Sequence, residues 1–323
     1  MVNQMKRKCL AVGIILLFVG TCIIPANGHR INELPSLPIS AGNTIYVDDD
    51  NVNGPWDGTI IHPFLTIKDG YNAANNGNTI FVFCGNYSTG YIKMYKSVSI
   101  VGQDTLRTIV RVVFDWSVFE IRVSGVRIEK LTLIGSGDPS YDSGTIEVYG
   151  DRCIIKNNNF IDGEWATGVI IYSGDYNIIK DNSFRDNHDG IALHNARCCL
   201  ITNNEIIQTG QAFSLERSSH NIISENDFHT DIVLSYSPNN IFSRNNIYGE
   251  ASFSSYIWGS INFWRRNYWG ESYSPFKVIK GTTKIPVGIE VHEHYPFIKY
   301  KTVNWYNYDW QPAQEPYDIT RMT

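Results

Sequence analysis

A short pattern of apolar and polar residues recurs along the middle of the chain. Each copy has an apolar pair, then polar residues, an asparagine at a fixed position and a large apolar residue two places later. Five clear copies begin at Cys153, Asn177, Cys199, Asn221 and Asn240, with weaker copies at 126 and 261. Their starts lie 24, 22, 22 and 19 residues apart. Repeats of this length are typical of a solenoid, in which each copy forms one coil.

The repeats predict strands and not helices. A second apolar segment follows the first in each unit, at residues 168–171, 190–193, 212–215 and 231–234. The units carry no long helical periodicity, which disfavours a horseshoe built from strands and helices. We therefore predict an all-β fold, a right-handed parallel β-helix, whose clearest repeats span residues 126–268.

The recurring asparagine should have a structural role. It stands at positions 158, 182, 204, 226 and 245. Asparagine tolerates the left-handed backbone conformation that a tight corner requires, so we expect these residues at the corners of the coils. Stacked asparagine side chains can also form hydrogen bonds from coil to coil as a ladder.

Both ends of the solenoid need a cap, because an open coil exposes unpaired strand edges. After Pro63, the residues Phe64, Ile67, Tyr71 and Ala74 follow a helical spacing. An amphipathic helix here would cover the first coil. The β-helix with this N-terminal cap is expected to span residues 44–270.

The repeat stops after Gly270. Residues 271–323 are rich in aromatic side chains, including Trp305, Tyr306, Tyr308 and Trp310. We expect this segment to pack over the last coil as an irregular C-terminal cap.

The N-terminus has the pattern of a secretory signal. A basic cluster, Lys6-Arg7-Lys8, precedes the apolar run from Cys9 to Ile24, and small residues follow before His29. We expect residues 1–28 to be a cleaved signal peptide and 29–43 a short linker. The protein would then be secreted or held at the cell surface, with no membrane span after cleavage. An uncleaved anchor is the alternative.

Charge and cysteine content narrow the picture further. The net charge of −5 and the pI near 5.9 argue against a nucleic-acid partner. The cysteines after residue 28 are Cys84, Cys153, Cys198 and Cys199. Cys153 and Cys199 fall two coils apart, about 10 Å, which is beyond the reach of a disulfide. We expect mostly free, buried thiols.

Outward-facing side chains of equivalent strands should line up in columns. In the strand that follows Gly190, alternation points Ile191 and Leu193 inward, and Ala192 and His194 outward. One predicted column contains Glu120, Glu147, Ile170, Ala192 and Ser214, and the other contains Arg122, Tyr149, Tyr172, His194 and Glu216. Neighbours in a column would be about 4.8 Å apart.

Two groups in these columns could carry catalysis. Glu120 and Glu147 would be spaced like the carboxylate pair of a retaining glycosidase. His194 beside Glu216 could exchange protons with a substrate. The alternative is an ordinary polar outer surface, on which such pairs arise by chance.

The repeat also carries a family resemblance. The motif Asn-Ile-Ile-x-x-Asn-x-Phe, followed by Gly-Ile-x-Leu, resembles the repeats of pectin-lyase-like right-handed β-helix proteins, and in particular their NosD-type branch. The opening segments Ile45–Asn51 and Gly54–Gly58 resemble the capping unit of that branch. The signature motifs of polygalacturonases, alginate epimerases and pectate lyases do not appear in the sequence.

The resemblance implies a polysaccharide or cell-surface glycan as partner, lying along the outward strand face. Aromatic side chains suited to sugar stacking are Tyr149, Tyr172 and Trp165, with Arg122, Asp186 and His188 as polar neighbours. Binding requires a less exact placement of side chains than cleavage does, so we favour binding over catalysis.

Three classes of function therefore stay open. The first is a secreted or cell-surface β-helix that binds carbohydrate or serves as structure, and we favour it. The second is a polysaccharide lyase, hydrolase or epimerase acting on the outward strand face. The third, implied by the NosD resemblance, is an accessory factor in the maturation of a metal enzyme. The oligomeric state is left open.

We expect no metal cofactor. Asp49-x-Asn51-x-Asn53-Gly54 matches the first half of a calcium loop, but Ile60 stands where the loop needs glutamate. Calcium is therefore a secondary possibility. Copper would require a cluster of soft ligands, which the sequence lacks.

Overall fold

The computed structural model describes residues 44–113, 117–136, 143–163, 165–256, 261–270, 276–292 and 295–319. All of them belong to one compact unit, residues 40–323. The expected signal peptide and linker, and Glu164, lie outside the described residues.

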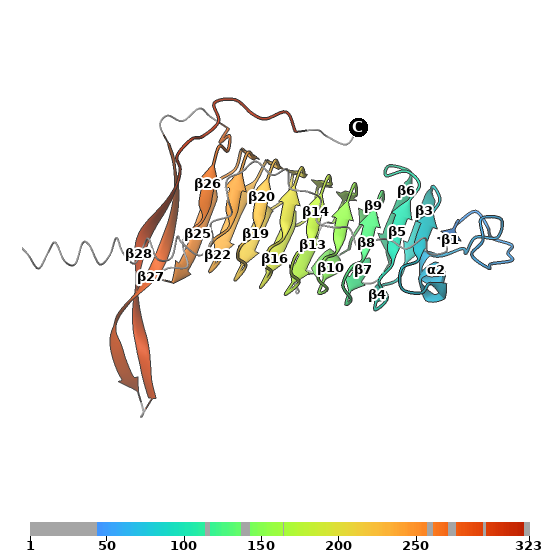
Figure 1. Ribbon diagram of the computed structural model, residues 1–323, viewed down its shortest axis with the longest axis horizontal. Helices are drawn as coiled ribbons and strands as arrows, with labels where there is room; N and C mark the ends of the chain where they lie inside the picture. Colours follow the sequence, from blue (N-terminus) through green and yellow to red (C-terminus); the bar gives the residue numbers. More distant parts are fainter. Residues whose placement is uncertain are drawn as a thin grey trace, which may run out of the picture. The chain divides into compact units, whose positions relative to one another are not determined.

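The described chain forms a parallel β-helix (Figure 1). Successive coils place their strands in three parallel rows, here named the first, second and third row in the order in which a coil visits them. Each strand pairs in register with the equivalent strand of the next coil, for example Ile155 with Ile179 and Phe160 with Phe184. The predicted fold class is confirmed.

The first row contains β1 (Thr44–Val47), β2 (Thr79–Val82), β5 (Ser99–Gly102), β8 (Arg127–Glu129), β11 (Ile154–Lys156), β14 (Ile178–Lys180), β17 (Leu200–Thr202), β20 (Ile222–Ser224), β23 (Ile241–Ser243) and β26 (Phe263–Arg265). The second row contains β3 (Gly85–Thr89), β6 (Thr108–Val112), β9 (Thr132–Ile134), β12 (Asn159–Ile161), β15 (Ser183–Arg185), β18 (Glu205–Ile207), β21 (Asp227–Phe228) and β24 (Asn246–Ile247). The third row contains β4 (Ile92–Met94), β7 (Phe119–Ile121), β10 (Ser143–Val148), β13 (Ala166–Tyr172), β16 (Ile191–His194), β19 (Gln211–Glu216), β22 (Asp231–Ser235) and β25 (Ala251–Tyr256).

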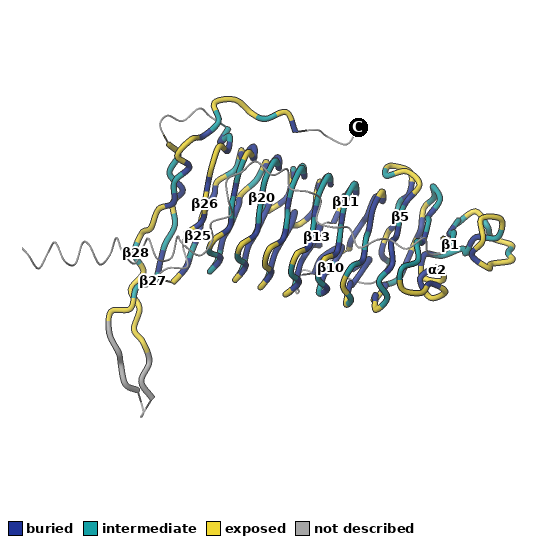
Figure 2. Tube along the Cα trace, viewed as in Figure 1, coloured by how far each residue is buried: buried dark blue, intermediate teal, exposed yellow. Residues whose placement is uncertain are grey.

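The core runs along the inside of the coils. Each strand turns alternate residues inward, where they stack on the same residue type in the next coil, as Phe160 stacks on Phe184 with ring centroids 4.6 Å apart. Both rings are fully buried, and each such burial contributes about 1.5–3 kcal/mol. Figure 2 shows the strands as largely buried, with exposed residues at the turns between them.

The recurring asparagines form the expected ladder, named here the asparagine ladder. The side-chain amide of Asn158 donates to the carbonyl oxygen of Asn182 at 3.2 Å, and that of Asn182 donates to Asn204 at 3.0 Å. The chain of bonds continues through Asn226 and Asn245 to Asn267. The ladder follows the corner between the first and second rows.

The expectation that these asparagines adopt the left-handed conformation is wrong. The residue before each of them has the positive φ instead, and these residues are Asn157, Asp181, Asn203, Glu225 and Arg244. Residue types at that position vary, and include asparagine, aspartate, glutamate and arginine. The asparagines are held by their coil-to-coil hydrogen bonds.

The four cysteines described by the structure are free, as expected. Cys153 and Cys199 are buried, whereas Cys198 is exposed and Cys84 is half-buried. Burial raises the pKa of Cys153 to about 11 and that of Cys199 to about 12, which keeps both thiols protonated.

The N-terminal cap contains α2 (Ile67–Ala73), which is shorter than the pattern suggested. Its N-cap is Thr66, whose hydroxyl accepts a hydrogen bond from the Asp69 backbone N–H at 3.0 Å, so the helix begins after Thr66 and not at Pro63. Ile67 and Tyr71 are buried and pack toward the first coil. None of the helical segments that the structure describes is long and apolar enough to cross a bilayer.

The C-terminal segment is more regular than expected. The strands β27 (Lys277–His292) and β28 (Tyr295–Asp309) form a long antiparallel hairpin. β27 also pairs with β25, and β28 meets β26 at Trp264 and Asp309. The base of the hairpin therefore extends the third and first rows beyond the last repeat, because its alternating β-branched and aromatic residues favour strands.

Candidate functional site

The structure places the predicted columns on the outside of the third row. Glu120 pairs with Glu147, and Glu147 pairs with Ile170. Tyr172 pairs with His194, and His194 pairs with Glu216. The register predicted from the repeats is therefore confirmed for these strands.

The second column is a continuous stack, named here the outer ladder. The Arg122 guanidinium lies 3.5 Å from the ring centroid of Tyr149. Tyr149 stacks on Tyr172 with centroids 5.0 Å apart, and Tyr172 stacks on His194 at 5.3 Å. His194 Nδ1 then lies 3.3 Å from Glu216 Oε2. Spacing by one coil per residue brings these side chains into contact.

This stacking changes the part that the tyrosines can play. Tyr149 is covered on one face by Arg122 and on the other by Tyr172, and Tyr172 lies between Tyr149 and His194. Their ring faces are occupied by neighbours, so a sugar cannot stack on them as the sequence suggested. Their ring edges, and not their ring faces, are turned toward any ligand.

The Glu120 carboxylate is neutralised by two cations. Glu120 is 3% exposed. Lys93 Nζ lies 3.1 Å from its Oε1, and the Arg122 Nε–H donates to the same oxygen. Such a buried, paired carboxylate is poorly placed to attack a sugar or to transfer a proton.

Glu147 is held by neutral donors. Its Oε1 accepts from Ser117 Oγ at 2.9 Å and from the Gly144 backbone N–H at 3.4 Å, and its Oε2 accepts from the Tyr149 hydroxyl at 3.2 Å. Burial and the charge of Glu147 raise the pKa of Tyr149 to about 12, so this hydroxyl stays protonated near neutral pH. The predicted carboxylate pair is therefore engaged in internal contacts.

The other end of the outer ladder is more open. The Glu216 side chain is 42% exposed, and its second oxygen lies 3.4 Å from Arg217 Nη1. The Glu216 carboxylate is thus open to solvent, whereas the His194 side chain is only 21% exposed and its Nε2 is buried.

The loop residues of the predicted site lie elsewhere. Trp165 is exposed and precedes β13, whereas Tyr172 ends that strand. A strand of this length separates its ends by roughly 20 Å. Asp186 and His188 are exposed in the loop before β16, also at the far end of the strand from His194. The structure therefore does not bring Trp165, Asp186 and His188 together with the outer ladder.

The calcium half-loop serves the N-terminal cap. Asp49 Oδ2 accepts from the Asn86 backbone N–H at 2.8 Å, and the Asn51 side-chain amide donates to the Pro63 carbonyl oxygen at 2.7 Å. Among the residues that the structure describes, no three His, Cys, Asp or Glu side chains group as a metal site would require. The expectation of no metal cofactor, with calcium as the secondary alternative, stays a prediction.

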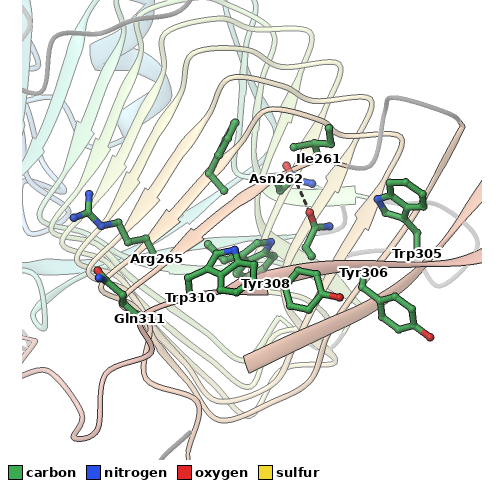
Figure 3. Close-up of a pocket in the computed structure, with 11 residues that line it drawn as sticks. Ile261, Asn262, Arg265, Trp305, Tyr306, Tyr308, Trp310 and Gln311 are labelled. Carbon is green, nitrogen blue, oxygen red and sulfur yellow. Dashed lines mark hydrogen bonds between the residues drawn. The ribbon is translucent and has the colours of Figure 1, made fainter. Parts of the chain in front are cut away.

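One cavity was missed by sequence reasoning. It has a volume of about 570 Å³ and lies between β26 and β28 at the C-terminal end of the solenoid (Figure 3). The aromatic run from Trp305 to Trp310 was the available signal, but it was interpreted only as a cap. The residues come together because β28 runs beside the last coil.

These features define a right-handed parallel β-helix protein of the pectin-lyase-like kind. The chain belongs to the NosD family, whose model, described as "Periplasmic copper-binding protein (NosD)", matches residues 71–274. No curated protein matches the chain significantly.

Solved structures confirm the fold alone. A DFA-IIIase from Arthrobacter chlorophenolicus A6, solved without its lid, is 13% identical with a TM-score of 0.54, and the match covers 70% of this chain and 72% of that one. The catalytic domain of a GH87 alpha-1,3-glucanase, in complex with nigerose, is 16% identical with a TM-score of 0.51. That match covers 62% of this chain but only 43% of the glucanase chain.

The donor set does not fit a copper site within the described residues. Copper prefers clustered thiolate, thioether and imidazole ligands. Met94, Cys153 and Cys199 are buried in the core, and no three His, Cys, Asp or Glu side chains cluster in the described part of the chain. We therefore assign no copper chemistry to these side chains.

Proposed function

We propose that this NosD-family β-helix protein binds a glycan along the outer ladder. The observation that supports the proposal is the continuous stack from Arg122 to His194, ending at Glu216. It presents a row of polar groups along the solenoid axis, in the direction in which an extended polysaccharide could lie.

The chemistry of the outer ladder suits sugar hydroxyl groups. Tyr149 is a neutral hydroxyl, Glu216 supplies acceptor oxygens, and Arg217 supplies donors beside it. Because the rings already hold one another in place, few side chains would lose freedom when a ligand binds. A long ligand could therefore gain several weak hydrogen bonds at little entropic cost.

Cleavage is the second candidate, and only the His194–Glu216 contact favours it. Glu120 is neutralised by Lys93 and Arg122, which removes it from the acid–base chemistry first expected of it. The exposed Glu216 carboxylate, held beside His194, could still transfer a proton to or from a bound sugar.

The test is affinity electrophoresis of the purified protein through gels that contain neutral or acidic polysaccharides. We expect retardation in at least one gel, and we expect Tyr172→Ala to reduce it because the substitution opens the middle of the stack. Tyr176→Ala is the matched control, since Tyr176 is an exposed tyrosine away from the outer ladder.

Reducing ends and unsaturated products are measured on the same samples. If the native protein forms product and the Glu216→Gln variant does not, the protein is an enzyme and not only a binding protein. An absence of retardation by every polysaccharide, or equal retardation of Tyr172→Ala and the native protein, would rule out the proposed site.

A further inference from the structure

The C-terminal cavity is lined by aromatic side chains that are widely exposed. Trp310 is 65% exposed, Phe263 is 56% exposed and Trp305 is 44% exposed. All three line the cavity, together with Tyr306 and Tyr308. Large rings left open to water in this way are common at sites that bind a ligand with an apolar face.

The wall composition selects the kind of ligand. Ile261 is the single aliphatic side chain among the residues that line the cavity, and aromatic rings provide most of the wall. Tyr308 and Trp310 pack against each other with ring centroids 5.2 Å apart and planes tilted by 33°, and Phe276 packs against both. Trp310 is still 65% exposed, and its open surface suits the flat C–H face of a pyranose ring. A volume of about 570 Å³ is sufficient for a small ligand of this kind.

The cavity is also positively charged. Arg265 lines it, and no ion pair or hydrogen bond of its guanidinium is found among the described residues. Figure 3 shows Arg265 and Gln311 at one end of the lining, and Trp305 and Tyr306 at the other. Lys280 is exposed and lies directly opposite Tyr306 in the hairpin, on the same face.

The Asp309 carboxylate at the end of β28 is engaged inside the protein. It is fully buried, and its two oxygens accept from the backbone N–H groups of Arg266 and Asn267. Arg265 and Lys280, by contrast, are both exposed. A ligand with a negative charge would complement Arg265 and Lys280.

Two further donors lie in the wall. Asn262 Nδ2 and Trp264 Nε1 are buried, and neither has an acceptor among the described residues. Buried donors of this kind gain free energy when an acceptor reaches them. Oxygen atoms of an acidic sugar are suitable acceptors.

We infer that the cavity between β26 and β28 binds a uronic acid residue of an acidic glycan. The sugar ring lies on the exposed side of Trp310, and its carboxylate pairs with Arg265. This site goes beyond the proposed function, because it lies at the end of the solenoid, shares no residue with the outer ladder and selects for charge.

The experiment titrates the purified protein with short oligomers of galacturonic, glucuronic and mannuronic acid, and with the matching neutral oligomers of galactose, glucose and mannose. Binding is followed by tryptophan fluorescence and by calorimetry. We expect at least one acidic oligomer to bind at least about tenfold more tightly than its neutral partner, because a charge-assisted contact is worth that much. Added salt should weaken the binding of the acidic oligomer.

Variants assign the binding to the cavity. Arg265→Gln should remove the preference for the acidic oligomer. Trp310→Ala should weaken the binding of acidic and neutral oligomers alike. Arg266→Gln and Trp165→Ala are the matched controls, because neither residue lines the cavity. Tyr172→Ala should leave this binding unchanged, which separates it from binding on the outer ladder.

Three results would overturn the inference. One is that none of the acidic oligomers binds. Another is that neutral oligomers bind as tightly as acidic ones. The third is that Arg265→Gln and Trp310→Ala bind like the two controls.

Discussion

At the scale of single residues, the asparagine ladder shows how one side chain holds three coils together. Asn204 Oδ1 accepts from both the backbone N–H and the side-chain amide of Asn182. Its own amide donates to Asn226 Oδ1 and to the Ile179 carbonyl oxygen. All of these groups are buried, so each bond that is lost leaves a polar atom without water.

Asn204→Ala should therefore lower the free energy of unfolding by about 3 kcal/mol. It leaves several buried polar groups without a hydrogen-bond partner, and each such loss costs about 1–3 kcal/mol. Urea unfolding followed by circular dichroism measures the change. The control is Asn203→Gly, which keeps the left-handed corner and should cost no more than about 1 kcal/mol. Equal losses in the two variants would show that the ladder contributes nothing specific.

The asparagine ladder could be predicted from the sequence only in part. The spacing of asparagines revealed a ladder, because stacking requires only equal positions in successive coils. It did not reveal that the left-handed corner falls one residue earlier, at Asn157, Asp181 and their equivalents. Side chains at that corner vary in type, so no pattern of residues identifies it.

At the scale of elements, the hairpin of β27 and β28 closes the ladders. The amide of Asn267, the last asparagine of the asparagine ladder, donates to Asp309 Oδ2 at 3.0 Å. A parallel series through Asn221, Asn240 and Asn262 ends where the Asn262 backbone N–H donates to Asn307 Oδ1 at 3.2 Å. β28 thus supplies the final acceptor of both series.

Asp309→Ala should destabilise the C-terminal end of the solenoid. Donors that lose their acceptor include the backbone N–H groups of Arg266, Asn267 and Gln311 and the indole N–H of Trp269. We expect a loss of about 3 kcal/mol or more in the free energy of unfolding. Thermal unfolding, with hydrogen exchange of β26 and β28, gives the measurement.

Asp318→Ala is the control for that experiment, because Asp318 is exposed near the C-terminus. If Asp309→Ala melts at the temperature of this control and its β28 amides exchange no faster, the hairpin does not depend on the carboxylate.

The hairpin itself escaped the sequence analysis for a physical reason. The repeat in the sequence has a period set by the coil, and an antiparallel hairpin has no such period. Residues such as Val278, Ile279 and Val303 carry ordinary strand preference, which says nothing about the partner. The cavity beside Arg265 depends on that pairing, so it could not be foreseen.

At the scale of the whole molecule, the family description raises the question of copper. The described residues offer no cluster of soft ligands, and the thiols of Cys153 and Cys199 are held protonated by burial. We expect purified protein loaded with Cu(I) to lose the metal to a chelator of moderate affinity. Metal analysis after chelation measures this, and one equivalent of copper retained per chain would contradict the expectation.

The predicted columns have the register that the structure shows, but the loop residues grouped with them lie elsewhere. Alternation and repeat spacing placed Tyr149, Tyr172 and His194 in one column, since a column follows from the fold alone. Grouping Trp165 with them failed, because sequence proximity hides the length of strand β13 between Trp165 and Tyr172. Contacts between side chains, such as the salt bridge of Lys93 with Glu120, required the structure.

Unequal repeat lengths, from 19 to 24 residues, coexist with asparagine positions that never lose contact. Extra residues are accommodated in the loops between strands, outside the ladder. Insertions and deletions can therefore accumulate in those loops during evolution without penalty to the scaffold. A lineage could acquire new surface chemistry there while inheriting the same internal frame.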